Sequence, residues 1–551
     1  MANPRNRRRT VAAVAALAAA LAVAFLLAPP MGTDLSAQVA RAEFVARHGF
    51  TPIDFGWYGG VSPYGYSLIT PPLMALLGPR PVGALALVVS AVAFALILLR
   101  TRADWPVLGG VLGAFCLAGN LVSGRITYAV GVAFGLLALA ALTAWPTPPR
   151  RERPAAPPWA SAAAVAGTLL AAVLAAAASP VAGLFVGLAG VAVALGDRTR
   201  WRAGLAVALA AAAPLVITGL VFGDGGWMNL SGLDAARACS VSLLVAALTP
   251  RRPLRIGALL AAAGVAVAYL VPTPVGLNAT RLAVMFALPL LAAYGRPPRH
   301  RLLPAPAALA ALLAVVAIWQ PPVSRVDLRH AGDPTADPGY FRPLLEELSR
   351  RPAGRVEVVP TANYWEAAYV PRQVPLARGW LRQVDLARNP LFFTGELDPA
   401  EYERWLRDNG VAYVAVAEAP PSWVGRREAE LIRRGLPYLT EVWRDQRWRL
   451  YAVRDATSVV EAPGRLVRAD AGSVVFVADQ PGDVLVRVRW SRWLRLSGPE
   501  GCLAAEGERT GREGIGPSRT EQGWTIVRVR VPGQYVVSGG LRPGPRCGPV
   551  R

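Results

Sequence analysis

The sequence predicts a polytopic α-helical membrane protein with a C-terminal region of α/β and β-sandwich structure. Three observations lead to this fold class. The 551 residues are 54% hydrophobic with a mean hydropathy of +0.36, which is typical of membrane proteins. Long runs of Ala, Leu, Val and Gly fill residues 1–320, whereas residues 325–551 lack any long apolar run. Arginine clusters occupy every second connection between the apolar runs.

The apolar runs predict about eleven transmembrane helices, because a spanning helix needs about 20 apolar residues. The first run, residues 11–27, follows the basic stretch Arg5–Arg9 and resembles a signal peptide. Because many further apolar runs follow, we interpret this first run as a signal anchor that stays in the membrane. The other ten are expected near residues 81–99, 106–123, 126–145, 160–178, 180–196, 202–222, 235–249, 256–271, 279–294 and 303–319.

The arginine clusters predict the orientation, since cytoplasmic loops carry an excess of basic residues. With the basic N-terminus, all the clusters fall in connections on one and the same side of the membrane. They are Arg100 and Arg102; Arg150, Arg151 and Arg153; Arg198, Arg200 and Arg202; Arg251, Arg252 and Arg255; Arg296, Arg299 and Arg301. We therefore expect a multi-pass cell-membrane protein with a cytoplasmic N-terminus. An odd number of spans then places the C-terminal region outside the cytoplasm.

Three regions follow from these boundaries. Residues 1–320 form the transmembrane domain, which includes a long first outer loop at residues 28–80. This loop is expected to be folded, with a helix over residues 34–50 and an interfacial helix over residues 66–77. Residues 325–454 are expected to form an extracytoplasmic α/β domain, and residues 455–551 an extracytoplasmic β-rich domain.

Local patterns place the elements of the C-terminal region. Helices are expected at residues 341–350, 399–409 and 426–434, with strands at 355–359 and 411–416 between them. Alternating runs at 473–478, 484–490, 526–531 and 535–537 predict a small β-sandwich. Cys502 and Cys547 share this region, and in an oxidising compartment they are able to pair.

Charge and cysteine content exclude two classes of ligand. A formal charge of +22 suggests nucleic acid in a soluble protein, but here the arginines of the apolar region are explained as membrane anchors. No nucleic-acid partner is expected. The four cysteines lack CxxC spacing and the three histidines are not grouped, so no metal site is predicted.

The candidate catalytic residues lie in the first outer loop. Asp34 follows the first span, and Asp54 lies in a segment that also contains Trp57 and Tyr58. A carboxylate on a folded outer loop can act as a general base, while aromatic faces bind sugar. The alternative for Asp34 is a helix N-cap or a solvated charge.

This arrangement of one span, an acidic residue heading a long first outer loop, about ten further spans and an outer C-terminal domain resembles the GT-C superfamily of polyprenyl-phosphate-sugar-dependent membrane glycosyltransferases. It is also similar to multi-spanning proteins of actinobacterial type. The resemblance implies a GT-C-like fold, with Asp34, and less directly Asp54, at the position of the catalytic acidic residue. It further implies a polyprenyl-phosphate-linked sugar as donor substrate, with no other cofactor, and a cell-envelope glycan or glycoprotein as acceptor. Membrane lipid and the lipid-linked sugar are the other expected partners.

Such a donor requires an arginine that binds its phosphate. Arg281 and Arg125 are both predicted near the outer ends of spans, where they depart from the positive-inside pattern. A guanidinium at that depth is able to pair with a phosphate. The alternative is that each side chain extends from an interfacial position to water.

Aromatic and ionisable residues of the C-terminal region supply further candidates. Tyr364, Trp365 and Glu366 are predicted to contribute to a surface that binds the acceptor sugar. The alternative is that they belong to the core of a small α/β domain.

Two other functions stay open at this stage. A secondary transporter is the class that the number of spans suggests, but transporters usually place polar groups and broken helices near the membrane midplane. Here the spans are strongly apolar and the distinctive residues collect at the outer face. A non-catalytic cell-envelope assembly protein would keep the architecture without the activity.

Overall fold

A computed structural model of the chain describes residues 4–145, 158–297, 304–506 and 523–548. Arg150, Arg151, Arg153, Arg299 and Arg301, from two of the predicted basic loops, lie outside these residues.

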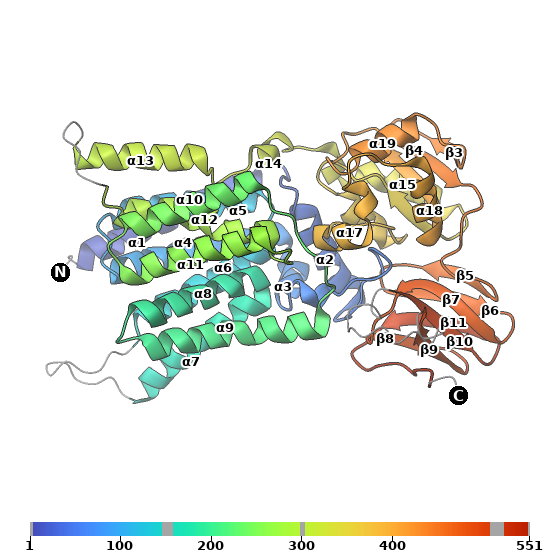
Figure 1. Ribbon diagram of the computed structural model, residues 1–551, viewed down its shortest axis with the longest axis horizontal. Coiled ribbons are helices and arrows are strands. Elements are labelled where there is room, and N and C mark those ends of the chain that lie inside the picture. The colour runs from blue at the N-terminus through green and yellow to red at the C-terminus, as the bar shows by residue number, and fades with distance from the viewer. Residues whose placement is uncertain (1–3, 146–157, 298–303, 507–522, 549–551) are drawn as a thin grey trace. The chain divides into compact units, whose positions relative to one another are not determined.

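The described chain forms two compact units (Figure 1). The first comprises Met1–Gln38 and Gly65–Ala331, and the second comprises Val39–Tyr64 and Gly332–Arg551. The middle of the long first loop therefore folds with the C-terminal region, whereas the sequence assigned residues 28–80 as a whole to the membrane region.

The first unit is a bundle of apolar helices with a helix at each of the eleven predicted spans. These helices are α1 (Pro4–Leu27), α4 (Pro79–Arg100), α5 (Pro106–Val122), α6 (Ile126–Thr143), α7 (Pro158–Ala178), α8 (Pro180–Gly196), α9 (Trp201–Phe222), α10 (Gly232–Leu248), α11 (Arg252–Leu270), α12 (Arg281–Tyr294) and α13 (Ala305–Trp319). The 3₁₀ turn η2 (Gly276–Thr280) leads into α12.

The length and composition of these helices agree with a multi-pass membrane protein. Six helices of the described residues are long and apolar enough to cross a membrane, namely those at Arg5–Leu27, Pro79–Arg100, Ile126–Thr143, Trp201–Phe222, Arg252–Leu270 and Gly276–Tyr294. Four shorter apolar helices accompany them.

Small residues allow the helices to approach closely, as is usual where lipid surrounds a bundle. Helices α8 and α9 show this best. A Cβ atom at Gly190 would lie 2.6 Å from the carbonyl oxygen of Gly204, and a Cβ at Gly204 would meet the α8 backbone at the same distance. Two short loop helices, α2 (Leu35–His48) and α3 (Thr70–Leu77), occur where the sequence predicts them.

The α/β half of the second unit contains a four-stranded sheet in the order β1-β2-β4-β3. Strands β1 (Arg355–Val358) and β2 (Val411–Ala417) run parallel, while β3 (Leu439–Arg444) and β4 (Trp448–Val453) extend the sheet antiparallel. The α-helices before and between these strands are α14 (Arg325–Arg329, in the first unit), α15 (Pro338–Ser349), α16 (Glu366–Tyr369), α17 (Arg382–Arg388), α18 (Pro399–Asp408) and α19 (Arg426–Arg433).

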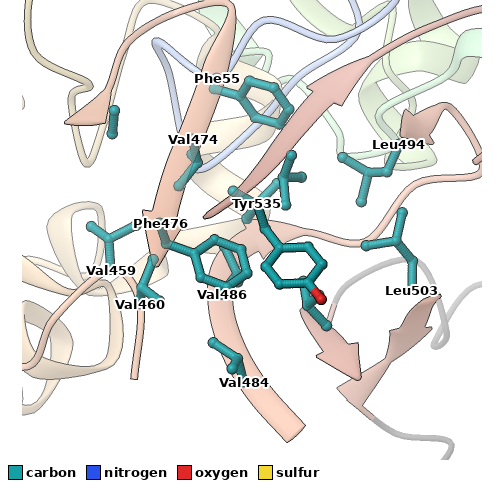
Figure 2. Close-up of a cluster of buried hydrophobic side chains, with 14 of the residues drawn as sticks. Phe55, Val459, Val460, Val474, Phe476, Val484, Val486, Leu494, Leu503 and Tyr535 are labelled. Atoms are coloured by element: carbon teal, nitrogen blue, oxygen red, sulfur yellow. The ribbon is translucent and has the colours of Figure 1, made fainter. Parts of the chain in front are cut away.

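Two antiparallel sheets make up the β-rich half, as the alternating sequence pattern predicts. One sheet has the order β7-β10-β9 and the other β5-β6-β11-β8. Their strands are β5 (Gly464–Ala469), β6 (Ser473–Ala478), β7 (Gly482–Arg489), β8 (Leu494–Ser497), β9 (Gly501–Ala505), β10 (Trp524–Val529) and β11 (Gly533–Gly539). Figure 2 shows the buried cluster formed by both sheets, with Phe476 and Tyr535 stacked within it.

The first loop contributes to the same core. Ile53 and Phe55 are buried in the cluster, and the Phe55 amide donates to the Ala471 carbonyl over 2.9 Å. These contacts explain why residues 39–64 belong to the second unit.

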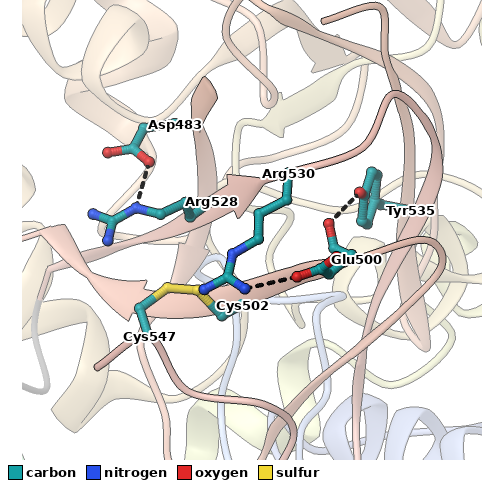
Figure 3. Close-up of a disulfide and its surroundings, with 7 residues drawn as sticks. All are labelled: Asp483, Glu500, Cys502, Arg528, Arg530, Tyr535 and Cys547. Carbon is teal, nitrogen blue, oxygen red and sulfur yellow. Dashed lines mark hydrogen bonds and ion pairs between the residues drawn. A yellow bond between two sulfur atoms is a disulfide. The ribbon is translucent and has the colours of Figure 1, made fainter. Parts of the chain in front are cut away.

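A disulfide joins Cys502 on β9 to Cys547 in the C-terminal segment, with 5.0 Å between the two Cα atoms (Figure 3). Backbone bonds from Leu503 and Cys547 hold the segment along the same strand. The two cysteines that the sequence places in one region are therefore paired.

Candidate active site

Asp34 stands immediately before helix α2, within a turn that packs on a second turn of the first unit. Its amide donates to the carbonyl of Ser123 over 3.2 Å, and its own carbonyl accepts from the Gln38 side chain over 3.3 Å. Asp34 and Arg125 therefore lie on adjacent turns, one directly before α2 and the other between α5 and α6.

Two glycines permit this close packing of backbone on backbone. Gly32 has a φ of +89°, and a Cβ there would lie 2.3 Å from the carbonyl carbon of Ser123. Gly124 has a φ of +75°, and a Cβ there would lie 2.4 Å from the amide nitrogen of Leu35. A side chain at either position would force the two turns apart.

The Asp34 carboxylate contacts two guanidinium groups. Its Oδ2 atom lies 3.3 Å from Nε of Arg125 and 3.6 Å from Nη2 of Arg281. Arg125 precedes helix α6 and Arg281 is the first residue of α12, so three separate segments converge on one carboxylate. The side chains of Asp34, Arg281 and Arg125 are 13%, 14% and 29% exposed.

Polar and aromatic side chains surround this group of charges. The Arg281 guanidinium lies over the ring of Tyr128, 5.1 Å from its centroid, which is the geometry of a cation–π contact. Within the described part of the chain the Tyr128 hydroxyl is buried without a hydrogen-bond partner. The Thr127 hydroxyl donates to the Gln38 side chain beside it.

One positive charge remains in excess among Asp34, Arg125 and Arg281. Buried charges are costly unless they are paired, so a largely buried guanidinium that shares one carboxylate has capacity for a second anion. Arginine binds phosphate oxygens in the same fork geometry as carboxylates. The arrangement is therefore suited to holding a phosphate next to a carboxylate.

Sequence patterns were sufficient to select Asp34, Arg125 and Arg281, but not Tyr128 and Gln38. Tyr128 stands three residues after Arg125 on α6, and Gln38 stands four residues after Asp34 on α2. Residues at these spacings share one helix face, so the spacing was the available signal.

The other predicted residues of the first loop lie in the second unit. The Asp54 carboxylate accepts from the amide of Gly56 over 2.8 Å within a tight turn. The Trp57 indole donates to the Ala367 carbonyl over 3.0 Å, and the Tyr58 hydroxyl donates to the Leu381 carbonyl over 3.3 Å. Both aromatic side chains are buried, so they join residues 53–60 to the α/β half.

Tyr364, Trp365 and Glu366 belong to the same interior. Trp365 and Glu366 are buried, and the Trp365 ring stacks on Tyr369 at 5.5 Å between centroids. Burial raises the pKa of Glu366 to about 7, while hydrogen bonds from Thr361 oppose this shift. This burial favours the α/β core, which is the alternative that the sequence left open for these residues.

A buried charge network lies beside these aromatic side chains and was not predicted. Arg378 pairs with Asp385 at 2.9 Å, with Glu428 at 3.1 Å and with Glu357 at 3.5 Å. One guanidinium thus faces three carboxyl groups, and burial raises the pKa of both Glu357 and Glu428. Spacing in the sequence did not indicate this network, because its members come from β1, α17, α19 and the loop before α17.

No protein-family model matches the sequence, and no curated protein is significantly similar to it. Solved structures that match include the arabinofuranosyltransferase AftD from Mycobacteria, at 18% identity and a TM-score of 0.46, over 82% of this chain and 42% of that one. The chain spans 42% to 60% of the AftD chains that it matches.

ArnT from Cupriavidus metallidurans also matches, in two states. Its apo structure matches at 13% identity and a TM-score of 0.45, over 80% of this chain and 97% of ArnT. Its structure bound to undecaprenyl phosphate matches at 11% identity and a TM-score of 0.36, over 82% of this chain and 98% of ArnT. These matches, all below 20% identity, are likenesses of fold.

Proposed function

We propose that this chain is a membrane glycosyltransferase that moves a sugar from a polyprenyl-phosphate donor to a cell-envelope acceptor. One observation carries the proposal. A single largely buried carboxylate, Asp34, faces two guanidinium groups at the ends of apolar helices. A lipid-linked phosphate sugar presents its charged headgroup at the end of such helices, because its polyprenyl chain stays in the hydrocarbon.

In this proposal Arg281 and Arg125 hold the donor phosphate. Phosphate competes with Asp34 for the two guanidiniums, so donor binding releases the carboxylate oxygens for other partners. The bond between the sugar and the phosphate oxygen breaks during transfer, and the leaving polyprenyl phosphate gains negative charge. The two guanidiniums stabilise that developing charge.

Asp34 acts as general base. The acceptor hydroxyl gives its proton to the Asp34 carboxylate while the acceptor oxygen forms a bond to the anomeric carbon. A positioned base contributes about 10²- to 10⁴-fold in rate. The buried Tyr128 hydroxyl is a further donor to the phosphate.

The test uses the purified full-length protein in lipid nanodiscs, with a panel of radiolabelled polyprenyl-phosphate pentoses and hexoses. Asp34→Asn is nearly isosteric, and we expect it to lower the transfer rate by about 10²- to 10⁴-fold. Arg281→Gln removes a charge-assisted contact, and we expect the KM for donor to rise roughly 10- to 100-fold. Release of polyprenyl phosphate measures both effects.

Asp104→Asn is the matched control. Asp104 also pairs with an arginine, Arg296, at 2.9 Å, but this pair is exposed and stands at the far ends of α5 and α12. If Asp34→Asn transferred sugar at the wild-type rate, Asp34 would have only a structural role in the turn before α2. Movement of sugar into sealed vesicles without release of polyprenyl phosphate would favour a transporter.

A further inference from the structure

Asp327 is a buried carboxylate of the first unit that the proposed reaction does not use. It lies on α14, a single short helix after the last apolar helix α13, and its residue is only 4% exposed. A carboxylate is expensive to bury, so its hydrogen bonds must replace those that water would make. Those bonds lead directly to the candidate site.

Asp327 bridges the two turns that carry Asp34 and Arg125. Its Oδ2 atom accepts from the Ser123 hydroxyl over 2.7 Å, and its Oδ1 atom accepts from the Thr33 amide over 3.3 Å. Thr33 directly precedes Asp34, and Ser123 stands two residues before Arg125. One side chain thus joins the base and one phosphate-binding arginine through their neighbours.

The segment before α14 is fitted against the same place. A Cβ atom at Gly119 would lie 2.5 Å from the carbonyl oxygen of Pro322. The connection from α13 to α14 therefore packs directly on the last turn of α5, which leads into Ser123. Backbone contact at Gly119 and the side-chain bridge of Asp327 hold the same two segments together.

We infer that Asp327 is a positioning residue that clamps the Thr33–Asp34 turn to the Ser123–Arg125 turn, and thereby fixes the spacing between the Asp34 carboxylate and the Arg125 guanidinium. Both donors to Asp327 are uncharged, so it holds backbone and hydroxyl groups and is not a partner of the phosphate. The functional consequence rests on the proposed glycosyltransferase activity. The clamp itself does not.

Three variants of the full-length protein test the clamp. Asp327→Ala removes both hydrogen bonds, and Ser123→Ala removes one of them. Asp327→Asn keeps an acceptor for the Thr33 amide and offers its amide group to Ser123, whose hydroxyl can turn to accept. Asp104→Ala, at the exposed pair with Arg296, is the control for loss of an unrelated carboxylate.

Hydrogen exchange of the protein in nanodiscs is the first measurement, and it needs no ligand. We expect faster exchange in peptides covering residues 28–38 and 119–128 for Asp327→Ala, a smaller increase for Ser123→Ala, and wild-type exchange for Asp327→Asn. Unchanged exchange in both peptides for Asp327→Ala would overturn the clamp. Faster exchange throughout the first unit would overturn it too, because that result indicates a general role in stability.

Affinity for undecaprenyl phosphate is the second measurement. We expect Asp327→Ala to raise the Kd about tenfold, which corresponds to about 1.4 kcal/mol, and Asp327→Asn and Asp104→Ala to leave it unchanged. Equal loss in Asp327→Ala and Asp327→Asn would contradict positioning. Absence of binding by the wild-type protein would instead count against the proposed function, and hydrogen exchange would still decide the clamp.

Discussion

Glu366 begins helix α16 with its carboxyl group inside the second unit, where the Thr361 amide and hydroxyl donate to its Oε2 atom. Burial disfavours the charged form more than these bonds favour it, so the pKa is raised to about 7. A residue that the sequence offered as a sugar contact therefore titrates near neutral pH because of where it is buried.

This shift predicts how the stability of the second unit depends on pH. The folded-state pKa of Glu366 exceeds its unfolded value. Its contribution to the free energy of unfolding is therefore fully present below about pH 4.5 and is lost as the pH rises towards about 7. We expect Glu366→Gln to lack this loss, which amounts to about 3 kcal/mol. Urea unfolding of the detergent-solubilised protein at pH 5 and pH 7.5, followed by tryptophan fluorescence, measures the difference.

Glu357 and Glu428 shift in the same direction, so both proteins should lose some stability over this range. The difference between wild type and Glu366→Gln in the pH dependence of the free energy of unfolding therefore gives the contribution of Glu366 alone. An identical pH dependence in the two proteins would show that Glu366 is ionised in the folded state.

Among the elements, the C-terminal segment after β11 depends on one covalent link. Cys502 and Cys547 close a loop across 45 residues, and hydrogen bonds between Leu503 and the segment run beside the disulfide. Near it, Arg528 pairs with Asp483 and Arg530 pairs with Glu500 (Figure 3). These surface pairs add little by themselves, so the disulfide is the main constraint.

Replacing both Cys502 and Cys547 by Ser should therefore destabilise the β-rich half. A loop of this length predicts a loss of about 3 to 5 kcal/mol in the free energy of unfolding by the chain-entropy account. The urea midpoint of the oxidised protein measures it, and Cys239→Ser, at a free cysteine, is the control. Titration of four free thiols in the unreduced protein would rule the bond out.

Strands whose sequence alternates between apolar and polar residues were easier to predict than strands without this pattern. Strands β6, β7, β10 and β11 alternate clearly in sequence and were expected, whereas β3 and β4 were not. Strand β3 is an edge strand with mostly exposed side chains, so its sequence lacks the alternation that marks a half-buried strand. The register of β3 is therefore set by its pairing with β4, which the sequence of β3 does not show.

For the whole molecule, the orientation in the membrane remains a prediction from the arginine clusters. A reporter fused after Arg551 should be active only outside the cytoplasm, because the positive-inside rule places the N-terminus inside and the number of predicted spans is odd. Alkaline phosphatase and green fluorescent protein fusions provide opposite readouts. Cytoplasmic activity after Arg551, with a fusion after Gly223 as an outer control, would mean that the number of spans after α9 is odd and not the predicted four.

The apolar runs by themselves determined that this is a multi-pass helical protein and where its helices lie. A run of that length hides its backbone polar groups only by forming a helix in lipid, so local composition is sufficient. The alternating strands of the β-rich half were likewise a local property. In the same way, composition and position selected Asp34, Arg125 and Arg281 as candidates.

Only the tertiary structure decided which candidates meet. Asp34, Arg125 and Arg281 come from three separate segments, and their convergence depends on turns that pack at Gly32 and Gly124. It also assigned residues 39–64 to the second unit and placed Asp327 against Thr33 across 294 positions of sequence. Contacts of this kind arise from packing between distant segments, and no local pattern of side chains encodes them.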